Sequence, residues 1–469
     1  MTTSPFRSFL FPALMVTTLS ACGSSVAEPG SGASGGTGEP DPGPTPTHVH
    51  TAYPGTGFIV HEWGTNTVVV GSDGSLQRGL HHEEEDLPGF VYDRIKAGSL
   101  PGTNSVEVKM ETPVTYFYSD KPRTVSASVA FPHGVFTQWY PAVQAFTPHI
   151  ASPTGQPSGS GFADPYLDPD YPFGSPQCKK DYTQLLNGNL DWGQIELLPR
   201  EVAPSEADVP KAPLTDYTWS YARNVAANRL RVTGAPGAEQ GQLEHFLFYR
   251  GLGNFELPVE IQAKGKGKVA LHNGYGEAVP RVFAIQVGGG KGAFTSFADG
   301  VLPSSTLDVD IPSMVGAKDT EAYAEALGES VTSALDDTGL YHDEALAMVN
   351  TWKRQWFGTP GTRLLYLIPQ SWTEGSIPLH LDPQPDKLVR VMMIRVELIT
   401  PEIEAADVEM ANQPGKGDLS PNAKSYFLSL GRFAEPRLRR ALSLIGNPSY
   451  GDAFLASVAT VETHVGTGE

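Results

Sequence analysis

Cysteine and positive charge are scarce in this chain. Its 469 residues include two cysteines, Cys22 and Cys178, and 33 lysines and arginines stand against 52 acids, for a formal net charge of −19. The acids are spread along the chain and no basic patch accompanies them. The composition therefore argues against nucleic-acid binding and against direct adhesion to anionic lipid. The apolar run at 9–19 is too short to span a bilayer as a helix.

The N-terminus has the pattern of a signal peptide. Arg7 precedes the apolar run at 9–19, and this order of a short charged and a short apolar segment is typical of an exported protein. The next residues, Leu-Ser-Ala-Cys at 19–22, resemble the bacterial lipobox. That resemblance implies a signal peptide over 1–21, cleavage directly before Cys22, and diacylation of Cys22 through its sulfur. The chain would then be attached to a membrane by its lipid.

A stretch rich in Gly, Ser, Pro and Thr covers 22–52. It contains almost nothing that could form a core, so we expect a disordered linker. About 30 such residues span roughly 30 Å as a coil, which would make the stretch a tether. Gly23, and not aspartate, follows the cysteine; by resemblance to enterobacterial sorting this favours the outer membrane. With Cys22 acylated, Cys178 has no partner in the chain, so the fold cannot depend on an internal disulfide.

The folded part is predicted to be rich in strands and turns. Fifty glycines and 40 prolines indicate a turn-rich β architecture. We expect a β-rich α+β fold, with a β-sandwich-like body and helical segments in the C-terminal third. The predicted parts are a β-rich domain over 53–312 with a Pro/Gly-rich loop at 150–178, an α+β segment over 313–415 packed on it, and a helical tail over 416–469.

Alternation of apolar and polar residues predicts the strands. It is clearest at 124–131, which indicates a strand with one buried face. The runs at 58–63 and 67–70 are predicted as two strands. Between them, Trp63 is expected to pack in the core and Gly64 to let the chain turn.

Further along the chain, two glycine-rich segments predict hairpins, at 264–268 and at 288–292. The second is not a phosphate loop, because its Gly-Lys pair is followed neither by Ser or Thr nor by a helix. The nearly continuous apolar run at 388–399 predicts a central strand.

Helical spacing of apolar residues predicts helices at 320–335 and 343–357. Ser420 followed by proline is an N-cap with proline at the first helical position. A short amphipathic helix is expected at 435–444, ended by Gly446.

Several segments resemble those of a family of exported bacterial proteins without an assigned activity, marked by a His-Glu-Trp-Gly-Thr motif. They extend over most of 58–440, so the resemblance implies one integrated architecture. It assigns no function to the chain, because the family has no assigned activity. The matching segments are 60–65, 79–85, 109–118, 246–251, 339–341, 352–357, 363–369 and 431–436.

Two segments, 61–62 and 81–86, contain the densest cluster of metal-binding residue types. Imidazoles and carboxylates together could hold zinc or another divalent ion, and a further glutamate could act as a base. Neighbouring histidines on a strand point to opposite faces, so both histidines of 81–86 could join one site only in a loop. The candidate ligands are His61, Glu62, His81, His82 and Glu84.

Other residues have weaker claims on chemistry. Aromatic clusters at 116–118, 139–140 and 246–249 could stack on a sugar, but core packing is the favoured interpretation. No histidine is paired with Cys178 in the sequence, so a reactive thiol is not favoured. Four more residues could add metal ligands but are expected to be structural: Glu111, His133, Glu244 and His245.

Three hypotheses on function remain open. The leading one is a non-catalytic lipoprotein, anchored in the cell envelope, that binds another envelope component, a protein or a glycan. The alternative is a divalent-metal-dependent hydrolase centred on His61, Glu62 and the 81–86 cluster. The third is a structural spacer of the envelope with neither a metal nor a soluble ligand. No cofactor beyond a divalent metal such as zinc is indicated, and no nucleic-acid partner is expected.

Overall fold

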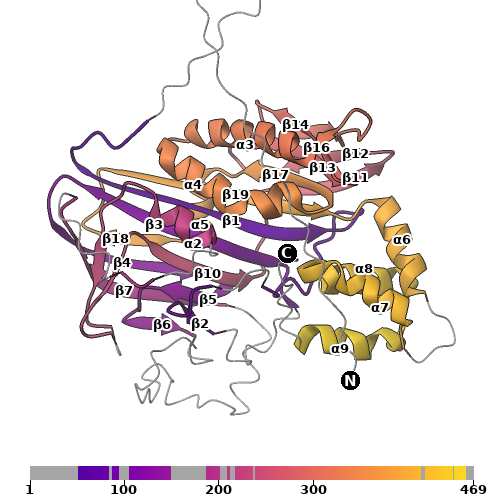
Figure 1. Ribbon diagram of the computed structural model, residues 1–469, viewed down its shortest axis with the longest axis horizontal. Helices are drawn as coiled ribbons and strands as arrows, with labels where there is room; N and C mark the ends of the chain where they lie inside the picture. Colours follow the sequence, from indigo (N-terminus) through magenta and orange to yellow (C-terminus); the bar gives the residue numbers. More distant parts are fainter. Residues whose placement is uncertain are drawn as a thin grey trace, which may run out of the picture. The chain divides into compact units, whose positions relative to one another are not determined.

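Strands dominate the structure, which is a computed structural model. Within the part of the chain that the structure describes, they form three sheets of ten, six and three strands, and most helices lie in the last third of the chain (Figure 1). The β-rich α+β class predicted from the sequence is confirmed. The described residues are 51–83, 87–94, 105–148, 186–200, 209–211, 217–235, 238–412, 418–446 and 448–460.

The ten-stranded sheet is the centre of the fold. Its middle strands are β19, β1 and β3; β1 runs parallel to β19 and antiparallel to β3, and every residue of β1 is buried. The central strand predicted at 388–399 is therefore confirmed. Strands from both sides of residue 312 belong to this one sheet. In order across it they are β16 (Lys318–Asp319), β14 (Lys291–Phe297), β13 (Val282–Gly288), β17 (Gly361–Leu367), β19 (Lys387–Leu398), β1 (Phe58–Val70), β3 (Val108–Ser119), β10 (Leu247–Gly253), β5 (Gly134–Tyr140) and β2 (Tyr92–Asp93).

The turn predicted at Gly64 is wrong, because β1 continues without a break through this residue. A Cβ atom on Gly64 would lie 2.9 Å from the Met392 sulfur and 3.0 Å from the Pro113 Cα. The neighbouring strands thus approach too closely for a side chain, and β3 bulges beside this point. Trp63 is fully buried, as predicted.

A six-stranded sheet packs on the β3, β10 and β5 part of the large sheet. Trp192 of β7 lies 6.2 Å from Tyr249 of β10, and Phe131 of β4 lies 5.7 Å from Phe136 of β5, measured between ring centroids. Apolar side chains alternate with polar ones along β4, as predicted, and point inward. The strands are β18 (Leu379–Asp382), β4 (Arg123–Phe131), β7 (Gly188–Leu197), β8 (Leu230–Val232) and β9 (Gln242–Glu244), with β6 (Ala145–Thr147) beside β7.

The third sheet is formed by β11 (Val259–Gly265), β12 (Lys268–Asn273) and β15 (Thr306–Asp310). Its β11–β12 turn, and the turn that joins β13 to β14, confirm the two predicted hairpins.

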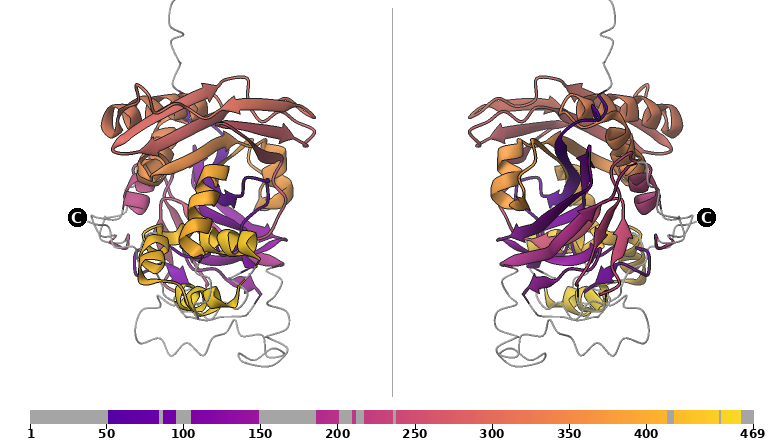
Figure 2. Two further views of the ribbon diagram at one scale, coloured as in Figure 1. Left: turned by 90° about the vertical axis from the view of Figure 1, so that its right-hand side faces the viewer. Right: turned by 90° about the vertical axis from the view of Figure 1, so that its left-hand side faces the viewer.

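Helices cover the other face of the large sheet. Helix α3 packs against β14 and β16, and α4 packs against α2 and α3; Figure 2 shows these orange helices beside one end of the sheet. On α4 and the π-helix η3, the apolar residues at helical spacing are buried, as expected for the helix predicted at 343–357; they are Ala345, Val349, Trp352 and Trp356. The helices of this face are α2 (Tyr217–Arg223), α3 (Thr320–Asp336), α4 (His342–Lys353) and η3 (Arg354–Gly358). Helix α5 (Gln370–Ser376) lies beside β19, and its Trp372 packs against Phe255, which contacts Phe131 of β4.

The last helices pack around a small apolar core of their own. The Ser420 side chain caps α7 by accepting from the Ala423 N–H, and Gly446 ends α8 in a left-handed conformation, both as predicted. Among the described residues, no helix combines the length and apolar character needed to cross a membrane. We call these the C-terminal helices: α6 (Pro401–Ala411), α7 (Pro421–Leu428), η4 (Gly431–Phe433), α8 (Ala434–Ile445), η5 (Ser449–Gly451) and α9 (Asp452–Thr460).

Candidate functional site

His61 lies on the helix-covered face of β1, in a buried polar network. Its Nδ1 atom is 2.7 Å from Glu344 Oε2, at the start of α4. The same carboxylate accepts from the Tyr118 hydroxyl at 2.9 Å and from the Tyr341 backbone N–H at 2.7 Å. Both His61 and Glu344 are fully buried, so this pair joins β1 to α4 inside the fold.

Glu62 points to the opposite face of β1 and belongs to a second network. Its Oε2 atom accepts from Arg390 Nε on β19 at 2.6 Å, and Oε1 accepts from the Thr115 and Tyr249 hydroxyls. Glu62 and Arg390 have no exposed surface. Burial, and then the charge of Glu62, raises the pKa of Tyr249 well above its ordinary value. The Glu62 carboxylate is therefore fully engaged within the core.

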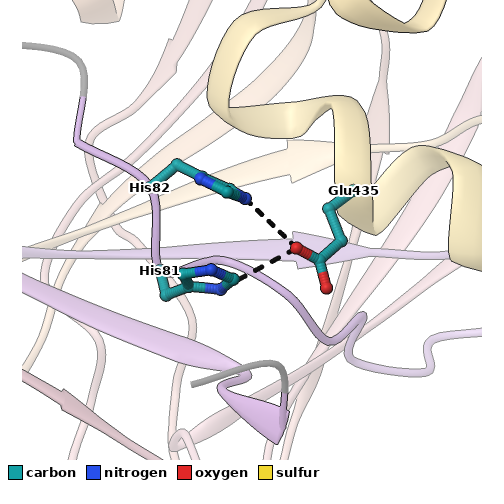
Figure 3. Close-up of side chains that lie close together, drawn as sticks. All are labelled: His81, His82 and Glu435. Carbon is teal, nitrogen blue, oxygen red and sulfur yellow. Dashed lines mark hydrogen bonds and ion pairs between the residues drawn. The ribbon is translucent and has the colours of Figure 1, made fainter. Parts of the chain in front are cut away.

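His81 and His82 meet Glu435 in a third cluster. His82 Nε2 lies 3.1 Å and His81 Nδ1 lies 3.9 Å from Glu435 Oε2. Figure 3 shows that the two histidines come from one short segment and point toward the carboxylate of Glu435, which extends from α8. One ligand atom of each residue lies within 4.8 Å of the others, and all three residues are buried. Among the histidines, cysteines, aspartates and glutamates that the structure describes, these three side chains form the group whose geometry could hold a metal ion.

The turn at 79–82 is held against α8 by its backbone and by Leu80. Gly79 adopts φ +97°, and a Cβ atom there would lie 2.5 Å from Glu435 Cγ. A glycine is thus required both by the backbone conformation and by the approach of Glu435. Leu80 is fully buried and packs in an apolar cluster that includes Phe433 of η4. Because His81 and His82 lie in this turn and not on a strand, both can face the same carboxylate.

Buried ion pairs surround the cluster. Lys109 Nζ on β3 donates to the His82 carbonyl at 2.5 Å and pairs with Glu83 at 2.9 Å; Arg250 pairs with Glu83 at 3.0 Å. Burial alone would raise the pKa of Glu83, but Lys109 and Arg250 together hold it below the ordinary value. The charge of Glu83 is therefore compensated from two strands of the large sheet.

Glu111 on β3 pairs with Arg432 of η4. Its other oxygen accepts from the Thr67 hydroxyl at 2.6 Å. Burial opposes ionisation, yet the charges of Arg432, Lys109 and Arg250 lower the Glu111 pKa to about 2. This pair attaches the C-terminal helices to the sheet beside the His81–His82–Glu435 cluster.

Glu435, the acid of the His81–His82–Glu435 cluster, has a second partner in Arg439. Oε1 of Glu435 accepts from Arg439 Nε at 2.7 Å and Nη2 at 2.5 Å. Burial would raise the pKa of Glu435, but the His82 hydrogen bond, His81 and Arg439 together lower it. Arg439 thus fixes the carboxylate so that Oε2 faces the histidines.

The structure separates the predicted ligands. It brings His81 and His82 together, but places His61 and Glu62 in two other networks on opposite faces of β1. Glu84 lies outside the described residues, as do Cys22 and Cys178. Glu435 was missed, because it is more than 350 positions away along the chain. The only signal in the sequence was that 431–436 and 79–85 both belong to the resembling segments.

The four weaker candidates have other surroundings. Glu111 is paired as described, and Glu244 is buried against Arg223 at 2.6 Å. Burial, with nearby Arg229 and Arg223, lowers the His245 pKa to about 4. His133 is exposed. None of these four belongs to a metal-ligand group within the described residues.

No protein-family model matches this chain, and no curated protein matches it in sequence. Arguments about function therefore depend on the motifs of the sequence and on the geometry of these three networks.

Proposed function

We propose that the protein is a lipoprotein of the bacterial cell envelope whose folded body binds another envelope component without catalysis. The anchor is proposed from the lipobox-like residues at 19–22, with Cys22 carrying the lipid and 22–52 serving as the tether. The outer membrane is the proposed location, since Gly23 follows the cysteine. This arrangement would keep the body within roughly 30 Å of the membrane surface.

The observation that supports a non-catalytic body is the enclosure of Glu62. A catalytic base or nucleophile must reach the substrate within hydrogen-bond distance. Glu62 instead has no exposed surface, and its oxygens accept from Arg390, Thr115 and Tyr249. His61 is equally buried and bonded to Glu344. A hydrolase centred on His61 and Glu62 is therefore disfavoured by the arrangement of both residues.

A protein is a better-supported partner than a glycan. The aromatic clusters that could have stacked on a sugar lie in the core: Tyr116, Trp139 and Tyr249 are each at most 1% exposed. They cannot form a stacking platform without disrupting the sheet. The excess of acids over bases suits a partner with a basic surface.

The test of the anchor is metabolic labelling with a palmitate analogue in a bacterial host. We expect label in the wild-type chain and in Cys178→Ser, and none in Cys22→Ser. Label that persists in Cys22→Ser would contradict the anchor.

The binding role is tested by in-cell cross-linking of the tethered chain, with isolated cell-wall glycan as a separate co-sedimentation arm. We expect a discrete adduct with an envelope protein and no sedimentation with glycan. Turnover of an ester, peptide or glycan substrate that is lost in a folded Glu62→Gln variant would refute the non-catalytic proposal.

A further inference from the structure

The His81–His82–Glu435 cluster offers two imidazole nitrogens and one carboxylate oxygen to a common point. Nitrogen donors of this kind suit zinc and similar transition metals, whereas calcium and magnesium prefer oxygen ligands alone. Three protein ligands leave at least one coordination position for water or another ligand. The donor set is therefore that of a zinc-class site.

The distances fit a shared ion. Zinc bonds of about 2.0–2.2 Å at tetrahedral angles place neighbouring ligand atoms about 3.4 Å apart. The two distances to Glu435 Oε2, 3.1 Å from His82 and 3.9 Å from His81, lie on either side of this value. Small side-chain rotations would equalise them. The imidazole rings of His81 and His82 are already adjacent, with centroids 4.1 Å apart.

The surroundings hold the ligands in place. Arg439 occupies Oε1 of Glu435 and leaves Oε2 directed at the histidines. Lys109 bonds the His82 carbonyl, which fixes the backbone between the histidine and Glu83. Hydrogen bonds of this outer kind orient metal ligands in proteins. All three ligands are at most 6% exposed, so bulk water does not compete freely at the site.

We propose that His81, His82 and Glu435 bind one divalent transition-metal ion of the zinc class. The ion joins the turn that follows β1 to helix α8 and so closes the C-terminal helices onto the sheet. This site is independent of the binding role proposed above, because joining the two segments of the fold requires no envelope partner.

The proposal is tested by calorimetric titration of zinc into the full mature chain after removal of bound metal with a chelator. We expect one ion per chain. His82→Ala and Glu435→Gln should each weaken zinc binding at least a hundredfold, and Arg439→Met should weaken it by about tenfold because it orients the ligand without touching the ion. His272→Ala and Glu402→Gln, at exposed positions, are the matched controls and should bind as the wild type does.

A second measurement needs no variant that could fail to fold. Cobalt added to the metal-free wild-type chain should give the visible absorption of a four- or five-coordinate site, and zinc should displace it. Absence of that absorption, or equal zinc binding by the wild type, His82→Ala and Glu435→Gln, would overturn the proposal. The hydrogen bond between His82 and Glu435 and the ion pair between His81 and Glu435 would then account for the cluster.

Discussion

Glu111→Gln should weaken the attachment of the C-terminal helices to the sheet. Glu111 on β3 pairs with Arg432 of η4 and accepts from Thr67, and its side chain is 4% exposed. The substitution preserves size but removes the charge. Arg432 would then remain buried without its carboxylate, which is the costly way to break a buried ion pair.

The magnitude follows from the pKa. Nearby positive charges outweigh burial and lower the Glu111 pKa from 4.5 to about 2, and each pKa unit corresponds to about 1.4 kcal/mol. The carboxylate therefore contributes about 3 kcal/mol at pH 7. Because the folded value lies below the unfolded one, this contribution is complete above about pH 5 and is lost as the pH falls toward 2. At pH 3.5 it should be about 2 kcal/mol.

The assay is urea unfolding of the wild type and Glu111→Gln at pH 7 and pH 3.5, followed by tryptophan fluorescence and circular dichroism. Coincidence of the two signals would justify a single free energy of unfolding. Glu260→Gln, at an exposed position of β11, is the matched control and should change stability by less than about 0.5 kcal/mol. A loss below about 1 kcal/mol for Glu111→Gln, or a loss that is the same at both pH values, would refute the reasoning.

Two further predictions concern the core. Glu62→Ala should lower the free energy of unfolding by about 3–5 kcal/mol, because Arg390 stays buried without its partner. The double variant Glu62→Leu, Arg390→Met should lose less stability, because it leaves no buried charge unpaired. A urea titration that finds the double variant less stable than Glu62→Ala would contradict this. Gly300→Ala should lower the free energy of unfolding by about 1–3 kcal/mol more than Gly316→Ala. Both glycines have positive φ, but only a Cβ atom at position 300 would clash, at 1.7 Å from the Val279 carbonyl oxygen. Equal melting temperatures of the two variants would contradict this.

Local patterns predicted most of the elements. Alternation along 124–131 fixes which face of β4 is buried, whichever strand lies beside it. The cap at Ser420 and the end at Gly446 depend on hydrogen bonds within a few residues, so the sequence was sufficient for both. The role of Gly64 could not be predicted. A glycine in a turn and a glycine under a neighbouring strand look alike in sequence, and only the packing of Met392 and Pro113 distinguishes them.

The candidate site was predicted in part. His81 and His82 were identified by residue type, but their shared orientation depends on the turn that Gly79 permits. Glu435 was beyond prediction, because a glutamate in the first turn of an arginine-rich amphipathic helix is ordinarily exposed, and nothing local marks this one as buried. His61 and Glu62 were grouped with the site by composition alone. Alternation along β1 in fact sends them to opposite faces, a consequence of period two that applies to any continuous strand.

X-ray absorption at the zinc edge tests the proposed metal site most directly. The full mature chain, loaded with one equivalent of zinc, should show nitrogen and oxygen neighbours at about 2.0–2.2 Å, the multiple-scattering pattern of two imidazoles, and no sulfur at about 2.3 Å. The imidazole pattern should fall to one ring in His82→Ala. A spectrum with sulfur ligation, or an unchanged imidazole pattern in that variant, would contradict a site formed by His81, His82 and Glu435.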